Sequence, residues 1–370
     1  MAPGAGSGRL RRNYVYSQRV SRDIGLVLLW MRGLGSSHLK KLINNPDDVA
    51  SETMEGFAAA FPQSVRILEN VRAIVRHDAP IPGKVAVVTG GGSGHEPMWW
   101  GYVGPGLPDA SVIGNVFAAP PPGPIYQTAK AVESGSGVLF IYGNYSGDVL
   151  NFDAAAEMLE AEGVPVAFVR TSDDVASAHP DRKCERRGVA GSFFTLKIAA
   201  ARAAEGADLE QVAGTANKAN LSTGSMALAL SSCTIPASGQ PIFRLAEDQV
   251  AIGMGGHGEP GIYEGPMRSA AELAHLMVSN LLADQAATTG DEVAVLVNGM
   301  GATPLGELLI MYRSISQLLG EAKIAICRSY VGNFCTTLDM AGCSVSLIRL
   351  DEELKRLLLA PADSPFFRQG

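Results

Sequence analysis

Short apolar runs alternate with longer helical runs through much of the first half of the chain. The runs "KVAVVT" (84–89), "GVLFIY" (137–142) and "VPVAFVR" (164–170) have the length and β-branched content of buried strands. An amphipathic run at 149–163 and an alanine-rich run at 191–206 have the pattern of helices. Strands that alternate with helices predict βαβ units, and therefore a mostly parallel sheet flanked by helices.

The second half repeats this alternation. We expect strands at "QVAIGM" (249–254), "EVAVLVNGMG" (292–301) and "SVSLIRL" (344–350), and helices at 269–284 and 304–320. The predicted fold class is therefore α/β throughout, with a mixed sheet and helices in this second part.

The two halves are joined by a segment of different composition. Residues 213–241 are rich in Ser, Thr, Ala and Gly, and they contain the turn-forming stretch "TIPASGQP". We place a domain boundary in this segment, after residue 225. The sequence thus predicts a first α/β domain over 39–225 and a second α/β domain over 226–370.

Residues 1–38 differ from both predicted domains. Their apolar run, 24–31, is too short to span a bilayer. No small-residue cleavage site of a signal peptide is evident after it. We interpret this segment as a disordered N-terminal extension, or as a mis-assigned start upstream of a true initiator at Met31.

Composition narrows the class of protein. The chain has 370 residues, of which 46% are hydrophobic and 18% are charged, as in an ordinary soluble globular protein. Its net charge is −7 and it has no basic stripe with interleaved aromatics, which argues against nucleic acid and anionic membranes as partners. Its five cysteines lack CxxC spacing, so we expect a reduced cytoplasmic protein without a metal site.

One glycine-rich loop, "GGGSGHEP" (90–97), directly follows a predicted strand. It is neither a dinucleotide fingerprint nor a P-loop, because His95 takes the place of the third glycine and no Gly-Lys-Ser/Thr ending occurs in the chain. What remains is a histidine at the C-terminal end of a strand, where open α/β sheets bind ligands. The alternative is an ordinary loop histidine with satisfied hydrogen bonds.

Two further loops carry candidate chemistry. "NYSGD" (144–148) places Asp148 near the start of a predicted helix, where the alternative role is that of a helix N-cap. "GMGGHGEPG" (253–261) surrounds His257 with five glycines, which a helix or strand interior would not tolerate. The alternative there is a tight turn in which the histidine is incidental.

Taken together, these motifs resemble a known family. The order "GGGSGHEP … NYSGDVLNF … DDVA … RRGVAG … GMGGHGEPG … GATPLGELLI … RSYVGNFCTTLDMAG" is similar to the substrate-binding subunit of dihydroxyacetone kinase. The opening "LKKLINNPDDV" is similar as well, so that the resemblance runs from about Leu39 to about Pro365. It implies the substrate-binding subunit of a kinase for a small ketose such as dihydroxyacetone.

The resemblance assigns roles to the candidate residues. It implies that His257 forms a covalent hemiaminal with the ketone carbon, and that His95 and Asp148 are the catalytic pair. A covalent bond to the ketone has two physical advantages. A ligand of about six heavy atoms gains at most ~1.5 kcal/mol of binding free energy per atom from non-covalent contacts. Glycerol, in addition, has no carbonyl that the histidine could attack. A neutral imidazole, the nucleophilic form, is readily available near the ordinary histidine pKa of ~6.5.

The remaining expectations from the resemblance concern the substrate pocket and the partners. It implies substrate contacts at Gly92, Ser93 and Gly143. It implies no cofactor on this chain, because a partner nucleotide-binding subunit holds ATP or ADP with Mg, and a phosphotransferase-system protein is a possible phosphodonor. It also implies a homodimer. This chain, which ends at Gly370, is then expected to be inert without its partner.

The sequence departs from the family pattern beside the catalytic loops. Gly143 replaces a usual lysine, and Met98, Trp99 and Trp100 replace small residues or histidine. We expect these changes to favour or admit a tetrulose, with space at Gly143 walled by one of the tryptophans. The alternative function is a ketone-sensing paralogue that acts as a transcriptional coregulator, although such a sensor needs only the histidine trap.

Overall fold

The structure is a computed structural model that describes Met1 and residues 40–285 and 287–370. Residues 44–370 form one compact unit, and the fold given below is that of this unit. The predicted extension, 1–38, lies outside the described residues apart from Met1. No helix in the described part of the chain is long and apolar enough to cross a membrane.

The first sheet has the strand order β1-β2-β4-β3-β5-β6. Strands β4, β3, β5 and β6 pair parallel with one another in this order, whereas β2 pairs antiparallel with both β4 and β1. The prediction of a mostly parallel first sheet is therefore confirmed. The strands are β1 (Val65–Ile67), β2 (Ala73–Arg76), β3 (Ala86–Ser93), β4 (Ala110–Val116), β5 (Val138–Gly143) and β6 (Val166–Thr171).

The second sheet has the order β11-β10-β12-β7-β8-β9 and is mixed, as predicted. Only the pair β10 and β11 is parallel, and the other pairs are antiparallel. Its strands are β7 (Thr223–Ala229), β8 (Gln249–Ile252), β9 (Tyr263–Pro266), β10 (Glu292–Gly299), β11 (Ala325–Gly332) and β12 (Gly342–Leu350). A separate hairpin joins β13 (Ala362–Ser364) to β14 (Phe367–Gln369).

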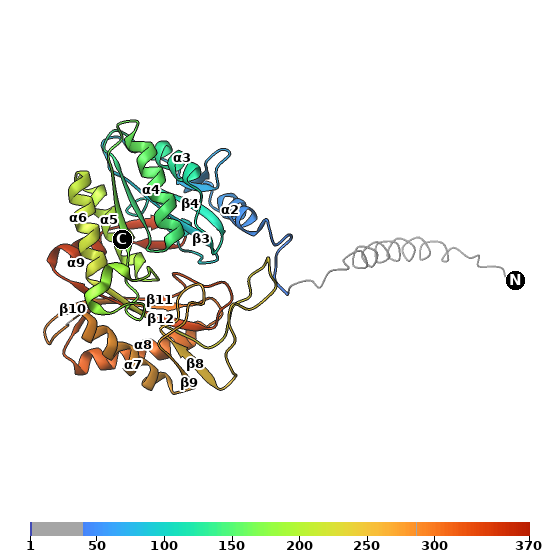
Figure 1. Cartoon of the computed structure of the whole chain (residues 1–370), viewed down its shortest axis with the longest axis vertical. Coiled ribbons are helices and arrows are strands. Elements are labelled where there is room, and N and C mark those ends of the chain that lie inside the picture. Colours follow the sequence, from blue (N-terminus) through green and yellow to red (C-terminus); the bar gives the residue numbers. More distant parts are fainter. Residues whose placement is uncertain (2–39, 286) are drawn as a thin grey trace. The chain divides into compact units, whose positions relative to one another are not determined.

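Helices lie on both faces of both sheets (Figure 1). They are α2 (Val49–Ala60), α3 (Pro122–Val132), α4 (Ser146–Glu160), α5 (Ser192–Ala204), α6 (Leu209–Leu221), α7 (Ala270–Gln285), α8 (Leu305–Glu321) and α9 (Glu352–Leu359), with short 3-10 helices η1 (Trp100–Tyr102) and η2 (Pro180–Glu185). Helices α3 and α4 cover one face of the first sheet, and α7 and α8 cover one face of the second.

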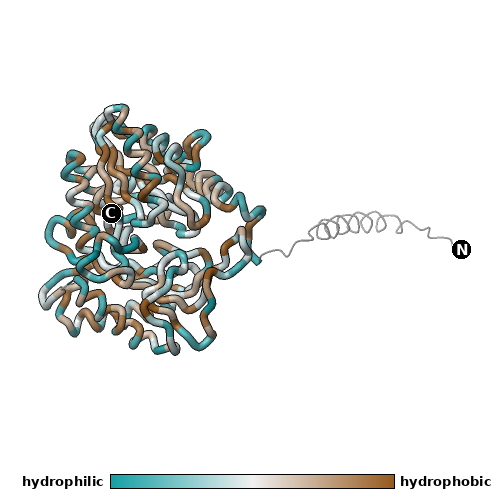
Figure 2. Tube along the Cα trace, viewed as in Figure 1, coloured by the Kyte–Doolittle hydropathy of each residue, from teal (hydrophilic) through white to brown (hydrophobic). Residues whose placement is uncertain are grey.

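Helices α5, α6 and α9 pack in the core that the two sheets share. Alternation along the strands explains this layering, because successive side chains point to opposite faces. In β3, Val88 packs with α3 and α4, whereas Val87 packs in the shared core. In β10, Leu296 packs in the shared core, whereas Val295 packs with α7 and α8. The apolar residues accordingly run along strands that have both faces covered (Figure 2).

The segment predicted to contain the domain boundary holds a central strand instead of a linker. Residue 225 lies inside β7, which pairs with β12 and β8 in the second sheet. Sequence analysis missed this strand because "TGSMALA" consists mostly of small residues, and only Thr223 among them is β-branched. The division into two domains stays a prediction, but the first residues of β7 belong structurally with the second sheet.

Candidate active site

A cavity of about 50 Å³ lies where strands of both sheets approach each other. It contains all three of the predicted catalytic residues, His95, Asp148 and His257, which come from three segments that are far apart in the sequence. The lining residues are Gly91, Gly92, His95, Trp99, Gly143, Tyr145, Asp148, Gly188, Val189, Ala190, Ala227, Met254, Gly256, His257, Asn298, Met300, Cys335, Thr336, Thr337 and Ser344.

His95 follows β3 directly and is almost fully buried. Its Nδ1 lies 2.9 Å from the carbonyl oxygen of Thr336, and its ring stacks on Phe117 with centroids 5.1 Å apart. Burial, together with the neighbouring His257, lowers the pKa of His95 to about 3. His95 is therefore a neutral imidazole at physiological pH.

His257 lies in the glycine-rich loop between β8 and β9. Its Nδ1 lies 3.2 Å from Glu259 Oε1, and its backbone N–H donates to Glu259 Oε2 at 2.9 Å. Burial alone would raise the pKa of Glu259, but the hydrogen bond and the electrostatic interaction with His257 lower it to about 2. A side chain at Gly255 would collide with this carboxylate, which explains one of the glycines in the loop.

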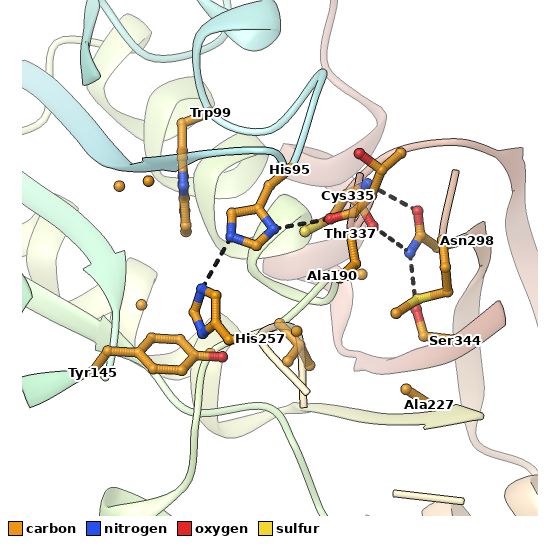
Figure 3. Close-up of a pocket in the computed structure, with 18 of the residues that line it drawn as sticks. His95, Trp99, Tyr145, Ala190, Ala227, His257, Asn298, Cys335, Thr337 and Ser344 are labelled. Carbon is orange, nitrogen blue, oxygen red and sulfur yellow. Dashed lines mark hydrogen bonds between the residues drawn. The ribbon is translucent and has the colours of Figure 1, made fainter. Parts of the chain in front are cut away.

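The two histidines face each other through Nε2 atoms that are 3.1 Å apart (Figure 3). Each Nδ1 faces an oxygen that only accepts hydrogen bonds, so each Nδ1 carries a proton. In neutral rings both Nε2 atoms then present lone pairs, and a hydrogen bond between them requires one additional proton. When His257 is neutral, its Nε2 therefore presents a lone pair to the cavity, and this is the nucleophilic form of an imidazole.

Asp148 lies in the first turn of α4, after β5. It is not the helix N-cap, since Tyr145 takes that position. The carboxyl is buried, and its Oδ1 has no hydrogen-bond partner. Burial raises the pKa of Asp148 to about 7, although His257 opposes the shift. Near pH 7 such a carboxyl is partly protonated, so it can exchange protons with a bound hydroxyl.

Only some of the residues that were predicted to contact the substrate line the cavity. Gly92 and Gly143 line the cavity. Ser93 is not among the lining residues, because its hydroxyl donates to the carbonyl oxygen of Gly114 at 2.8 Å within the sheet. A Cβ at Gly143 would lie 3.0 Å from the ring of Tyr145, so that this ring fills part of the space expected to be open there.

Sequence reasoning missed the residues that orient His95. Asn298 Nδ2 donates to the carbonyl oxygen of Cys335 at 2.8 Å and to Ser344 Oγ at 3.0 Å. Asn298 Oδ1 also accepts the backbone N–H of Cys335 at 2.8 Å. These bonds fix the segment that presents the Thr336 carbonyl to His95. Because Thr336 contacts the ring through its backbone, its residue type gives no signal of this role.

The comparisons with known proteins agree with this geometry. The Dak1 domain model matches residues 55–366. The PTS-dependent dihydroxyacetone kinase 2, dihydroxyacetone-binding subunit DhaK, of Listeria innocua is 43% identical over 89% of this chain and 99% of its own length. D-erythrulose kinase of Mycolicibacterium smegmatis is 41% identical over 90% of this chain, which spans 57% of that protein.

A solved structure described as the dihydroxyacetone kinase operon co-activator Dha-DhaQ is also similar. It is 29% identical, has a TM-score of 0.81, and the match covers 86% of this chain and 98% of the other. The family model and the curated relatives span the site and most of the described fold. The protein therefore belongs to the Dak1 domain family, which its motifs predicted.

Proposed function

We propose that this chain is the substrate-binding subunit of a small-ketose kinase, acting on dihydroxyacetone or a tetrulose such as erythrulose. The observation that carries the proposal is the convergence of His95, Asp148 and His257 in one cavity. The similarity to a dihydroxyacetone-binding kinase subunit and to an erythrulose kinase supports the same substrate class.

His257 captures the ketone in this proposal. Its Nε2 lone pair attacks the carbonyl carbon, an N–C bond forms, and the carbonyl π pair moves to the oxygen, which takes up a proton. The positive charge on the ring is balanced by Glu259, whose carboxylate faces Nδ1 at 3.2 Å. Loss of the Nδ1 proton leaves a neutral hemiaminal. A polyol without a carbonyl cannot be held in this way.

His95 and Asp148 then act on the hydroxyl that attacks the phosphoryl donor. The Thr336 carbonyl fixes the proton of His95 on Nδ1, so that Nε2 accepts a hydrogen bond from the hydroxyl and orients it. Asp148 accepts the hydroxyl proton through its unpartnered oxygen. In a loose phosphoryl-transfer transition state most of the catalysis is positioning, so this pair of weak bases suffices.

The phosphoryl group comes from a partner in this proposal. A nucleotide-binding subunit carries ATP or ADP with Mg, and this chain binds no cofactor of its own. A phosphotransferase-system protein as ultimate donor is supported by the relative that is named PTS-dependent. We also propose that the subunit is a cytoplasmic homodimer.

Reconstitution tests the proposed function directly. The chain is mixed with a nucleotide-binding subunit, Mg-ATP and either dihydroxyacetone or erythrulose, and the phosphorylated ketose is followed by ³¹P NMR. Phosphoryl transfer that requires both proteins supports the proposal. Capture of the ketone without any transfer would favour the second candidate.

That second candidate is a ketone-sensing coregulator of transcription. The similarity to a dihydroxyacetone kinase operon co-activator favours it. A sensor, however, needs only the trap at His257, whereas this cavity also holds the buried Asp148 carboxyl. An unpaired buried carboxylate is costly, which is a reason to retain it only where it acts on the substrate. Binding of the ketose-loaded chain to a DNA-binding regulator separates the two candidates.

The raised pKa of Asp148 predicts an acid limb in the pH–rate profile. Below a pKa of about 7 the carboxyl already carries a proton and accepts no other. We therefore expect kcat/KM of the reconstituted kinase to rise about tenfold from about pH 6 to about pH 8 and then level off. With a pKa of about 3, His95 does not titrate in this range.

Capture at His257 is followed in parallel with ketose labelled with ¹³C at the ketone, and its pH profile must differ from that of the rate. A flat rate profile, or one identical to that of capture, would contradict the assignment.

Substrate size provides another prediction. Gly143→Lys inserts a long side chain against Tyr145, which itself lines the cavity, and so reduces the room for a fourth carbon. We expect kcat/KM for erythrulose relative to that for dihydroxyacetone to fall about tenfold. Gly143→Ala, which adds one methyl group, serves as the smaller step in the series. Equal ratios in all three proteins would show that this position does not select the substrate.

A further inference from the structure

Two of the residues that line the cavity carry a buried polar side-chain atom without a hydrogen-bond partner. They are Trp99, through Nε1, and Asp148, through Oδ1. Buried donors and acceptors are nearly always paired in proteins, and an unpaired one costs stability. One is a donor and the other an acceptor, and both belong to a cavity that the site residues surround. This combination indicates a ligand that both accepts and donates hydrogen bonds.

Trp99 extends into the site beside His95 and opposite Tyr145 (Figure 3). Nε1 is the indole atom nearest to a Cβ built at Gly91, followed by Cε2 at 2.9 Å and Cδ1 at 3.1 Å. The N–H edge of the indole therefore lies against Gly91, which itself lines the cavity. Trp99 is 8% exposed. Glycine at position 91 therefore permits the indole to form one wall of the cavity.

The neighbouring tryptophan has a different environment. Trp100 packs in a separate core with Phe57, at a centroid distance of 4.5 Å, and with Phe366, at 6.3 Å. It does not belong to the residues that line the cavity. Of the two tryptophans expected to wall the substrate, only Trp99 is placed to do so, and Trp100 provides a matched control.

We propose that Trp99 determines substrate specificity by donating its indole N–H to the ketose hydroxyl that is not phosphorylated. The inference rests on the proposed function, which assigns the carbonyl carbon to His257 and the reacting hydroxyl to His95 and Asp148. That leaves the other hydroxyl of dihydroxyacetone and the oxygen of the captured carbonyl, and Nε1–H of Trp99 is the buried donor among the lining residues that has no partner. The rigid indole also closes the wall against which the rest of the chain of a tetrulose packs.

The first test observes the indole directly in the full chain. The protein has three tryptophans, Trp30, Trp99 and Trp100, and their ¹H–¹⁵N indole resonances are assigned with single phenylalanine variants. Addition of dihydroxyacetone labelled with ¹³C at the ketone reports capture in the same sample. We expect the Trp99 resonance to move as capture proceeds and the Trp100 resonance to stay nearly fixed. Capture with an unmoved Trp99 resonance would overturn the inference.

The second test measures selectivity in the reconstituted kinase. Trp99→Phe keeps an aromatic wall and removes the donor, so kcat/KM for dihydroxyacetone is expected to fall about tenfold. Hydroxyacetone lacks the second hydroxyl, and with it the same variant is expected to lose less than about twofold. Trp100→Phe should change neither value. An equal loss with both ketones would overturn the hydrogen bond, and a wild-type protein that captures no ketose would overturn the proposed function itself.

Discussion

Replacing His257 by alanine is expected to abolish covalent capture of the ketose. The variant loses the ring nitrogen that attacks the ketone in the proposed mechanism, and His95 does not replace it, because its ring is buried, its Nδ1 faces Thr336 and its Nε2 is assigned to the reacting hydroxyl. A ligand of about six heavy atoms then depends on hydrogen bonds alone. We expect affinity for dihydroxyacetone to fall at least about a hundredfold, which corresponds to about 2.7 kcal/mol. Discrimination against glycerol should largely disappear.

The measurement is the adduct mass of the intact protein, together with the ¹³C signal of a ketone-labelled ketose. The fold should persist, since the His257 side chain is 27% exposed in a loop and its removal leaves both sheets untouched. His179→Ala, which removes an exposed histidine that does not line the cavity, is the control. An adduct of unchanged mass in His257→Ala would place the trap on another residue.

Residues that act through side chains in glycine-rich loops could be predicted from the sequence. His95 and His257 lie in glycine-rich loops, Asp148 lies near the start of a helix that follows a strand, and the structure brings all three into one cavity. Thr336 could not be predicted, because a backbone carbonyl orients His95 and carries no signature in the residue type. Glu259 stood two residues from His257 and was overlooked, although so short a separation permits the observed contact.

The sequence predicted the reactive groups of the cavity better than it predicted the space available inside it. The absence of a lysine at Gly143 predicted open space, but the ring of Tyr145 lies against that position. Trp99 and Trp100 are adjacent in the chain, but Trp99 lines the cavity and Trp100 packs in a separate core. Which of them enters the cavity therefore depended on the path of the backbone. Side-chain direction after an irregular loop follows from tertiary packing, and no periodicity specifies it.

The same distinction holds for the fold. Strands such as β5 and β10 have continuous apolar runs, typical of strands that are covered on both faces, and were predicted. Strand β7 is equally buried but consists mostly of small residues, one of which, Ser225, donates its hydroxyl to the buried Asp173 carboxyl. Its pattern resembles that of a linker, so that the predicted boundary fell inside it.

Replacing Asp148 by asparagine is expected to preserve capture of the ketose and to abolish most phosphoryl transfer. The amide has nearly the same shape but accepts no proton from the attacking hydroxyl. Removal of a general base typically costs between about a hundredfold and ten-thousandfold in rate, and we expect kcat of the reconstituted kinase to fall within this range. The adduct on His257 should form as in the wild type. Glu259 faces His257 Nδ1 and balances the charge of the adduct, and Asp148 does not contact Glu259.

The same substitution is expected to stabilise the fold. An acid whose pKa rises from 3.8 to about 7 on folding holds its proton longer in the folded state. The wild type therefore loses this contribution to its stability as the pH rises from about 4 to about 7, and the variant lacks that loss. The gain in unfolding free energy should grow over this window to at most about 4 kcal/mol. Thermal unfolding at about pH 4 and at about pH 8 measures it.

Asp153→Asn is the matched control for both effects. Asp153 lies on the same helix, α4, but its carboxylate is 40% exposed and pairs with Arg170 at 2.8 Å outside the cavity. That variant should keep both turnover and capture, and its loss of a partly exposed ion pair should change stability by less than about 1 kcal/mol. Near-normal turnover in both Asp148→Asn and His95→Ala would require new roles for the pair. A stabilised Asp148→Asn protein that captures the ketose and transfers no phosphoryl group would show that the buried carboxyl is kept for the reaction at the expense of stability.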